Sequence, residues 1–334
     1  MRDALLGLIG GFRLSQMIAV AARLRIADHL RDGPRTARAL AQLTGSHPDA
    51  LYRVLRTLAS LGVFAEDEPG LFRLTPMSEW LRSDVEGNVR ISAEVVGEEW
   101  MWRPWGALAH TVSTGETAFD ALYGQDTWTW FGDHPEAARL FDSLMDEITL
   151  ADAKAIVAGV DFSAYRTIVD VAGGRGVLLA EILQRHPGAR GLLFNVPAVI
   201  ASARQTVPSG LIDRIEFTSG DFFQAVPAGG DLYIMKNILH DWSDPDATRI
   251  LTTCRRAMPP RATLLIIERL VGPPNERVAG KVGDVQMMVR TGGRNRSTAE
   301  LSGLLTATGF QEPVAHPTTT GPDVLFAALA GQAG

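Results

Sequence analysis

The chain has 334 residues, of which 46% are hydrophobic and 21% are charged, a balance that is ordinary for a soluble globular protein. Its formal net charge of −6 argues against general nucleic-acid binding, because a phosphate backbone is held by a surplus of Lys and Arg. The single cysteine, Cys254, excludes an internal disulfide framework and a Cys-rich zinc site, and it fits a reducing cytoplasm. A prior of ~150 residues per domain predicts two domains, or one large domain with an appendage.

The first segment, MRDALLGLIGGFRLSQMIAVAARLRIADHL, is apolar but is interrupted by polar side chains at Arg13, Gln16, Arg23 and Arg25. It has neither an uninterrupted run of ~18 apolar residues nor a small-residue cleavage site. We therefore expect an amphipathic helix here, and neither a membrane span nor a signal peptide. The apolar faces in Leu5–Ile9 and Leu14–Ala22 lack a partner within a small three-helix unit, so we expect a C2 homodimer to bury them.

Residues 1–85 have the pattern of a winged helix. Helical periodicity covers Leu14–Leu30, Thr36–Leu43 and His47–Leu61, and GVFAEDEPGLFRLT predicts a hairpin around a Glu-Pro-Gly turn. This shape serves either for DNA binding or for dimerisation and scaffolding. The predicted wing carries three acidic residues against the single Arg73, and acidic wings repel phosphate. The sequence therefore favours dimerisation over DNA binding.

Residues 86–155 are expected to be mostly helical, and they form a linker that contributes to the substrate pocket. Five of the tryptophans fall in this segment: Trp100, Trp102, Trp105, Trp128 and Trp130. Aromatic clusters on helices are more often core than ligand cage. However, aromatic walls suit a flat organic substrate, so both interpretations stay open for Trp100 and Trp102.

Residues 156–334 alternate predicted strands and helices. The strands are expected at Thr167–Ala172, Gly191–Val196, Ile215–Ser219, Leu232–Ile238 and Leu264–Leu270. The helices are expected at Gly176–Arg185, Ala198–Thr206, Ala247–Met258 and Thr298–Thr308. Alternation of this kind predicts an open, mostly parallel α/β sheet with helices on both faces, and VAHPTTTGPDVLFAALA predicts a final antiparallel hairpin. In such sheets, ligands bind beyond the carboxyl ends of the strands.

The stretch TIVDVAGGRG predicts a cofactor site at a strand-to-helix turn. Gly173, Gly174 and Gly176 let the backbone approach a ligand closely, but their spacing differs from the G-x-G-x-x-G of dinucleotide sites. Asn195 follows the second strand, where an acidic residue normally binds an adenosine ribose. Asp221 follows the third strand, where its carboxylate can accept a hydrogen bond from an adenine amine or cap its own loop. Together these features favour an adenosyl ligand.

The stretch KNILHDWSDPD places His240, Asp241 and Trp242 where an apolar strand ends. A histidine in this position is either a catalytic base or a turn residue that bonds a backbone carbonyl. The residues alone favour the turn, and they favour a packing role for Trp242.

Nearly the whole chain resembles the class I S-adenosylmethionine-dependent small-molecule O-methyltransferases of the caffeate and acetylserotonin type, especially the bacterial members that modify natural products. The resemblance rests on the order and spacing of DVAGGRG, FNVP, GDFF, KNILHDWSD and GGRNRSTAE. It implies a Rossmann-like, seven-stranded catalytic domain behind an N-terminal winged-helix dimerisation domain. It also implies a cytoplasmic enzyme of secondary metabolite biosynthesis that converts S-adenosylmethionine to S-adenosylhomocysteine without a metal.

The same resemblance implies roles for individual residues. Those expected to bind the cofactor are Asp170, Ala172, Gly173, Gly174, Gly176, Asn195, Asp221, Phe222 and Lys236. The glycines line its methionine end, Asp221 and Phe222 meet the adenine, and Asn195 meets the ribose. His240 becomes the general base, with Glu268 and Asn295 as its orienting partners, while Asp241 bonds substrate or positions the loop.

Three positions depart from the family pattern. Ala172 occupies the first position of a triple glycine, Asn195 replaces the ribose carboxylate and Asn295 replaces a catalytic carboxylate. We expect Ala172 to be tolerated if its φ is negative, and His240 to be a weaker base than one flanked by two carboxylates. The departures leave open an alternative in which the bound cofactor supports hydroxylation or ring formation without methyl transfer. A DNA-binding regulator that senses an adenosyl ligand is disfavoured by the acidic balance.

The acceptor is expected to be a polycyclic aromatic or polyketide-derived phenol. In addition to Trp100, the residues expected to line the substrate pocket on the wall facing His240 are Met145, Asn237, Met287 and Met288. Methionine suits flat, irregular apolar ligands, although an ordinary core position explains each methionine equally well. With His240 as the base, we expect activity to survive excess EDTA.

Overall fold

The computed structural model describes residues 1–276, 279–316 and 322–329. The chain separates into two compact units, Met1–Arg103 and Pro104–Gly334. The three-part division with boundaries at residues 85 and 155 stays a prediction.

The first unit combines short helices with a small antiparallel sheet. Its elements are α1 (Arg2–Arg23), α2 (Ile26–His29), β1 (Arg35–Thr36), α3 (Ala37–Thr44), α4 (Pro48–Ser60), β2 (Phe64–Glu68), β3 (Leu71–Leu74), the 3-10 helix η1 (Ser78–Leu81) and α5 (Arg90–Val95). The hairpin β2–β3 is the predicted wing, and β1 pairs with the other side of β3. Helix α3 begins where Thr36 Oγ1 accepts the N–H of Ala39, and it ends at Gly45, whose φ is 66°. Leu40, Leu55 and Phe72 are fully buried in the core of this unit.

The helix expected in the first segment is present as α1, but the bounds Leu14–Leu30 given by its periodicity are wrong at both ends. Helix α1 already begins at Arg2, and it ends at Arg23 because Arg25 adopts a left-handed φ of 52° before α2 starts. Among the described residues, α1 is the one helix that is long and apolar enough to cross a membrane by length and composition alone. Several of its apolar side chains are exposed within this unit, among them Leu8 and Phe12.

The second unit contains the large sheet. The helices before the sheet are α7 (Leu108–Thr114), α8 (Ala118–Tyr123), α9 (Thr127–Asp133) and α10 (Pro135–Gly159), and α6 (Glu99–Gly106) spans the division between the units. The strands are β4 (Thr167–Val171), β5 (Arg190–Asn195), β6 (Ile215–Ser219), β7 (Leu232–Lys236), β8 (Thr263–Glu268), β9 (Val314–His316) and β10 (Asp323–Ala328). The remaining helices are α11 (Val177–Arg185), α12 (Pro197–Thr206), η2 (Ser209–Arg214), η3 (Leu239–Asp241), α13 (Asp244–Ala257), α14 (Ala279–Arg290) and α15 (Thr298–Ala307).

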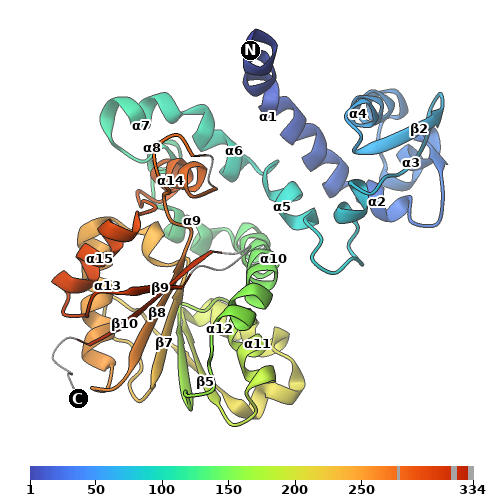
Figure 1. The fold of residues 1–334 in the computed structure, drawn as a ribbon. Coiled ribbons are helices and arrows are strands. Elements are labelled where there is room, and N and C mark those ends of the chain that lie inside the picture. Colours follow the sequence, from blue (N-terminus) through green and yellow to red (C-terminus); the bar gives the residue numbers. More distant parts are fainter. Residues whose placement is uncertain (277–278, 317–321, 330–334) are drawn as a thin grey trace. The chain divides into compact units, whose positions relative to one another are not determined.

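Seven strands of the described chain form one sheet in the order β6-β5-β4-β7-β8-β10-β9 (Figure 1). Strands β4 to β8 are parallel to one another, whereas β10 is antiparallel to both β8 and β9. After β4 the chain adds β5 and β6 on one side and then returns to add β7 and β8 on the other. The point between β4 and β7 is therefore the topological switch point, where open α/β sheets bind their ligands.

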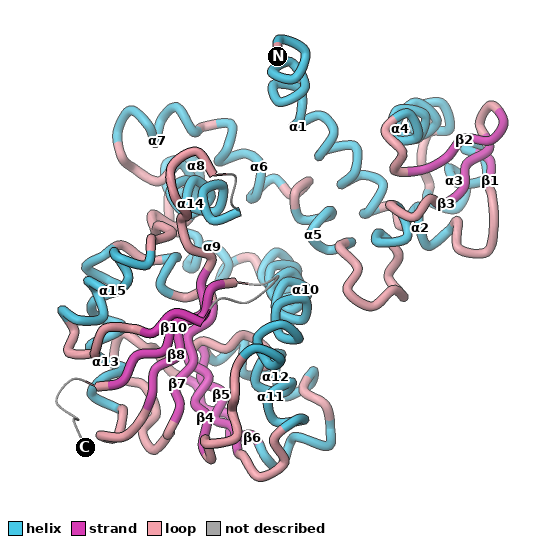
Figure 2. The backbone as a smooth tube through the Cα atoms, viewed as in Figure 1, coloured by secondary structure: helices cyan, strands magenta, loops and turns pink. Residues whose placement is uncertain are grey.

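Helices cover both faces of this sheet (Figure 2). Apolar side chains of α10, α11 and α12 pack with Ile168, Leu193 and Ile234 on one face. Those of α13 and α15 pack with Val171 and Met235 on the other. The strands are buried on both sides, which explains why they are nearly continuous hydrophobic runs in the sequence.

The fold class predicted from the alternation of strands and helices is confirmed, with most element boundaries within one or two residues of the prediction. The predicted pairing of the C-terminal hairpin is present in β9 and β10, while its turn at 317–321 lies outside the described residues. Helix α14 is absent from the sequence prediction.

Candidate active site

The glycine-rich turn after β4 is built from left-handed backbone. Ala172, Gly174 and Gly176 have φ values of 56°, 57° and 82°, and the chain then enters α11. The condition under which Ala172 was expected to be tolerated, a negative φ, is therefore not met. An alanine in this region carries a strain of roughly 1–2 kcal/mol that a glycine avoids.

A buried carboxyl group lies directly under this turn. A Cβ added to Gly173 would come within 2.3 Å of the Asp170 carboxyl, so only glycine fits there. Burial raises the pKa of Asp170 to about 7 although Lys236 lowers it. Asp170 Oδ2 has no hydrogen-bond partner among the described residues. A glycine cradle above an unpartnered carboxyl oxygen fits the polar methionine end of an adenosyl cofactor.

The residues expected at the adenosine lie at the carboxyl ends of β5 and β6, on the same edge of the sheet. Asn195 Oδ1 accepts the N–H of Val196 at 2.8 Å, and Asp221 Oδ1 accepts the N–H of Phe223 at 2.8 Å. One oxygen of Asp221 thus caps its own loop, as the alternative interpretation of this residue required.

Lys236, at the end of β7, is held by a carboxylate that the sequence analysis did not single out. Its Nζ lies 3.1 Å from Asp152 Oδ2, and Arg269 Nη2 lies 2.9 Å from Asp152 Oδ1. Burial lowers the pKa of Lys236, and the charge of Asp152 opposes that shift. Asp152 thereby ties α10 to the ends of β7 and β8. The sequence signal that could have revealed Asp152 is its position as a lone acid on the buried face of the long helix α10.

His240 lies in η3, directly after β7. Its Nδ1 is 3.1 Å from Glu268 Oε2, and its Nε2 is 3.8 Å from Asp241 Oδ2. The other oxygen of Glu268 accepts the backbone N–H groups of Ile238, Leu239 and His240 at 3.2, 2.9 and 3.3 Å. One buried carboxylate therefore holds the backbone of the turn by hydrogen bonds and faces the imidazole at ion-pair distance.

The charges around the imidazole favour its protonated form. Burial lowers the pKa of His240, but Glu268 and Asp241 outweigh burial and raise it to about 9, against a smaller opposing effect of Lys236. Burial raises the pKa of Asp241, which His240 and Arg290 oppose. Burial lowers the pKa of Arg290 to about 10, opposed by Asp241. An imidazole in this setting readily takes up a proton, which is the property required of a general base.

Asn295 makes different contacts from those expected of an orienting partner for His240. Its Nδ2 donates to the carbonyl oxygens of Arg269 and Gly280, each at 3.0 Å, and its backbone N–H donates to Asp284 Oδ1 at 2.9 Å. Within the described part of the chain, no hydrogen bond of Asn295 reaches His240. The second carboxylate near the imidazole comes instead from Asp241, its neighbour in the sequence.

The residues expected to face the acceptor lie on several elements. Asn237, directly after β7, has a φ of 55°, and its Oδ1 is buried without a hydrogen-bond partner among the described residues. Met145 lies on α10, and Met287 and Met288 lie on α14, which packs against η3. Trp100 is buried in the first unit. Their contact with substrate stays a prediction.

Aromatic rings pack around Trp242. Its ring centroid lies 4.8 Å from that of Phe223 and 5.7 Å from that of Phe222, both edge to face, and Trp128 stacks on it at 6.3 Å. The predicted packing role of Trp242 is confirmed by these contacts. They join α9 to the loops after β6 and β7.

The structure also bears on metal binding. The described residues contain no group of three or more His, Cys, Asp or Glu side chains that could hold a metal ion. Independence from metal stays a prediction.

Comparison with known proteins identifies the class. Residues 105–311 match the family model of the O-methyltransferase domain, and residues 6–84 match that of the O-methyltransferase dimerisation domain. The phenazine O-methyltransferase PhzM of Lysobacter antibioticus is 41% identical, over 97% of this chain and 95% of that protein. A phenazine-1-carboxylate N-methyltransferase of Pseudomonas aeruginosa is 32% identical, over 92% of this chain and 91% of that protein.

A solved structure supports the same assignment to the O-methyltransferases. An O-methyltransferase from neocarzinostatin biosynthesis, in complex with S-adenosylmethionine and 2-hydroxy-5-methyl naphthoic acid, has a TM-score of 0.83 and 34% identity, and the match covers 94% of this chain and 95% of that chain. The chain belongs to the O-methyltransferase family. It is an S-adenosylmethionine-dependent methyltransferase that forms a homodimer through its N-terminal domain.

Proposed function

We propose that this enzyme methylates a hydroxyl group, phenolic in character, on a polycyclic aromatic natural product, with His240 as the general base. The observation that carries the proposal is the placement of His240. It lies at the sheet's switch point, after the strand beside the glycine turn, between the carboxylates of Glu268 and Asp241. S-adenosylmethionine supplies an electrophilic methyl group on a sulfonium, and the protein must deliver a nucleophilic oxygen to it.

The pKa of His240 suits this task. A phenol has a pKa of ~10, close to the value of about 9 for His240, so the proton moves between groups of similar affinity. Because Nδ1 is engaged by Glu268, Nε2 is the atom that accepts the proton. As the oxygen–carbon bond forms and the carbon–sulfur bond breaks, His240 becomes an imidazolium that Glu268 and Asp241 stabilise. The products are the methyl ether and S-adenosylhomocysteine.

The residues proposed to hold the cofactor form a continuous edge of the sheet. Asp170 and the turn Ala172–Gly176 surround the methionine end. Asn195 serves the ribose through the amide nitrogen that its bond to Val196 leaves available. Asp221 and Phe222 serve the adenine, and Lys236 lies beside them, steadied by Asp152.

The acceptor is proposed to be flat and aromatic. Two relatives are named for phenazines, and a solved relative holds a naphthoic acid. Met145, Asn237, Met287, Met288 and Trp100 are the proposed lining residues. An oxygen acceptor is favoured over nitrogen because the relative with higher identity is an O-methyltransferase. We assign the reaction to the cytoplasm, where Cys254 stays a free thiol.

The test begins with calorimetric titration of S-adenosylmethionine and S-adenosylhomocysteine into the parent and His240→Ala. We expect both proteins to bind both ligands with similar affinity. Phenols, naphthols and phenazines are then screened for uptake of a labelled methyl group, and His240→Ala is expected to be slower by a factor of about 10²–10⁴. Equal rates of methyl transfer in both proteins would refute the role of His240. Tight cofactor binding with no methyl transfer to any oxygen or nitrogen acceptor would favour the alternative, hydroxylation or cyclisation.

A further inference from the structure

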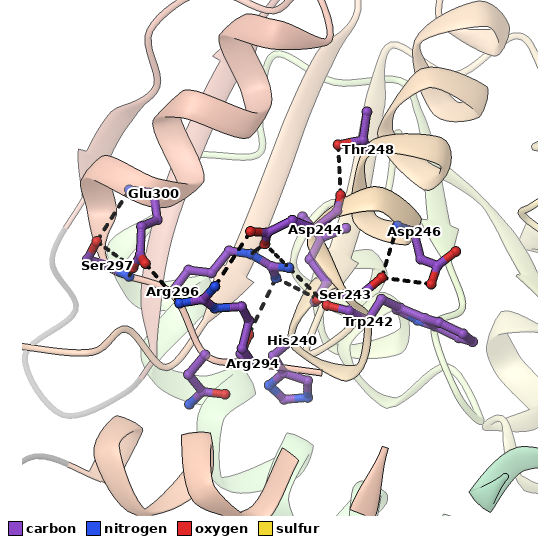
Figure 3. A network of polar contacts seen from close by, with 12 residues as sticks. His240, Trp242, Ser243, Asp244, Asp246, Thr248, Arg294, Arg296, Ser297 and Glu300 are labelled. Atoms are coloured by element: carbon purple, nitrogen blue, oxygen red, sulfur yellow. Dashed lines mark hydrogen bonds and ion pairs between the residues drawn. The ribbon is translucent and has the colours of Figure 1, made fainter. Parts of the chain in front are cut away.

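Arg296 is a buried cation that lies outside both the cofactor edge and the catalytic group. It belongs to the GGRNRSTAE segment between α14 and α15, and its side chain is only 2% exposed. Its guanidinium donates from Nη1 to the carbonyl oxygen of Leu239 at 2.7 Å and from Nη2 to that of Trp242 at 2.9 Å. These two carbonyls are on either side of His240 and Asp241. Figure 3 shows the guanidinium between Asp244 and the turn that carries His240.

Asp244 fixes the orientation of this guanidinium. Its Oδ1 accepts from Nε of Arg296 at 2.9 Å and from Nη2 at 2.8 Å. Asp244 is the first residue of α13, so its carboxylate lies at the positive end of that helix. The planar fork of Arg296 is thus held from one side and presents its remaining donors to the turn.

The turn is restrained from two directions. Glu268 accepts its N–H groups at residues 238–240, and Arg296 donates to its carbonyl groups at residues 239 and 242. The loop before Arg296 also lies against it, because a Cβ on Gly293 would come within 2.1 Å of the His240 carbonyl oxygen. Both restraints act on the backbone that aims the imidazole, and neither requires a bound ligand.

We propose that Arg296 is a positioning residue, which holds the turn at residues 239–242 so that the imidazole of His240 stays against Glu268. The inference rests on the proposed role of His240 as the base. Without Arg296, the carbonyl oxygens of Leu239 and Trp242 lose a charged donor, and that of Leu239 keeps only the N–H of Trp242 at 3.2 Å. The turn then relaxes, and the contact between His240 Nδ1 and Glu268 loosens. The imidazole of His240 is then still present, but its orientation toward the substrate oxygen is no longer fixed.

The chain offers a matched control. Arg294 lies in the same segment and also pairs with Asp244, at 3.6 Å, and with Glu300, at 3.1 Å. Its side chain is half exposed, and neither of these partners belongs to the turn at residues 239–242 that carries His240. Arg294→Gln therefore removes a guanidinium from the same network without touching the turn.

The experiment compares Arg296→Gln and Arg294→Gln with the parent. The pKa of His240 is measured by NMR titration of protein labelled in its histidine rings, with the His240 signal assigned by its loss in His240→Gln. Calorimetric binding of S-adenosylhomocysteine checks that each variant is folded. With an acceptor in hand, kcat and KM are measured as well.

In Arg296→Gln we expect the pKa of His240 to fall from near 9 toward the ~6.5 of a free imidazole, because Glu268 no longer faces it squarely. The kcat should fall by about 10-fold or more, while the Kd for S-adenosylhomocysteine and the KM for the acceptor change little. Arg294→Gln should match the parent in all of these values. Arg296→Lys, which keeps the charge but not the fork, should fall between the parent and Arg296→Gln.

Two outcomes would overturn the proposal. One is a folded Arg296→Gln in which the pKa of His240 and kcat equal those of the parent. The other is a loss of thermal stability and kcat with an unchanged pKa of His240, which would assign Arg296 to the fold alone. If Arg296→Gln does not fold, the same two readings on Arg296→Lys decide. The titration needs no acceptor, so it tests Arg296 even if His240→Ala shows that another group is the base.

Discussion

The strain at Ala172 is a property of a single residue that can be removed. Ala172→Gly keeps the glycine-rich turn and relieves a left-handed alanine at a φ of 56°. The relief of roughly 1–2 kcal/mol exceeds the ~0.5–1 kcal/mol that glycine loses through its freer unfolded state. We expect the free energy of unfolding to rise by up to about 1 kcal/mol, and the thermal midpoint by a few degrees, in a thermal scan.

Ala201→Gly is the matched control for that change. Ala201 lies on the exposed face of α12, where helical geometry requires no left-handed backbone. The same chemical substitution should there lower the stability by about 1 kcal/mol. A lower thermal midpoint for Ala172→Gly as well would contradict the strain argument.

The pH dependence of catalysis follows from the charges that flank His240. A base must be neutral to accept a proton, and the pKa of His240 is raised to about 9. We therefore expect kcat/KM to be low at neutral pH, to rise as the imidazolium loses its proton, and to reach half its plateau near pH 9. Glu268→Gln removes the largest charge that opposes burial, so this midpoint should move to lower pH, toward or below ~6.5.

Asp241→Asn provides the graded comparison. Asp241 is farther from the ring, at 3.8 Å from Nε2, so its loss should move the midpoint in the same direction by less than the loss of Glu268 does. Glutamine at 268 can still accept the backbone N–H groups of the turn. The Glu268→Gln variant therefore removes the negative charge beside His240 but keeps the hydrogen bonds that hold the turn. A midpoint that stays in place in both variants would show that the titration in the profile belongs to another group.

Some functional side chains were predictable from their place in the sequence and others were not. His240 follows one predicted strand and Glu268 lies near the end of the next, so their proximity follows from parallel pairing of those strands. Asn295 was predicted near the imidazole by motif spacing alone, but its contacts depend on how the loop after α14 folds, which periodicity does not reveal. Asp152 was missed because a single acid on a helix has no local pattern that names its partner.

At the scale of the elements, the approach of the α14–α15 loop to η3 is governed by Gly293. A Cβ at this position would lie 2.1 Å from the carbonyl oxygen of His240 and 2.4 Å from the carbonyl carbon of Asp241. Gly293→Ala must therefore displace the turn that carries the base. We expect a loss of about 1–3 kcal/mol in stability and of about 100-fold in kcat, measured by unfolding and by steady-state kinetics.

Gly303→Ala tests the same substitution where space is available. Gly303 is exposed on α15, and no atom lies within 4 Å of a Cβ built there. Alanine should stabilise this helix by up to about 1 kcal/mol and leave kcat unchanged. Gly293→Ala with parental kcat would mean that η3 tolerates displacement.

The elements that were predicted well have local signals. The strands of the sheet are apolar runs that end at glycine or polar residues, and α13 starts with a serine cap at Ser243. Helix α14 was missed because GKVGDVQMMVR contains glycine and lacks a clear apolar period, so neighbouring elements stabilise it. The break at Arg25 was missed because neither glycine nor proline marks it, and a left-handed arginine depends on its tertiary surroundings.

At the scale of the whole chain, the site depends on topology. The switch between β4 and β7 brings together residues from positions 170 to 268, which are dispersed in the sequence but lie at one edge of the sheet. The cofactor edge and the catalytic turn then share a strand boundary, because Lys236 ends β7 and His240 follows it. This arrangement was predictable from the order of strands and helices, whereas the hydrogen bonds that tune it were not.

The homodimer gives the last prediction at this scale. The matched dimerisation domain begins at residue 6 and includes most of α1, where Leu8 is 77% exposed and Phe12 is 66% exposed within its own unit. Burying each side chain contributes about 1.5–3 kcal/mol, and a two-fold interface counts each of them twice. Leu8→Glu combined with Phe12→Glu should therefore reduce the mass in sedimentation equilibrium at micromolar concentration from twice 36.1 kDa to 36.1 kDa. Val314→Glu changes an exposed apolar side chain on β9 instead, and it should leave the dimer intact. A dimer that survives the double change would show that α1 does not carry the interface.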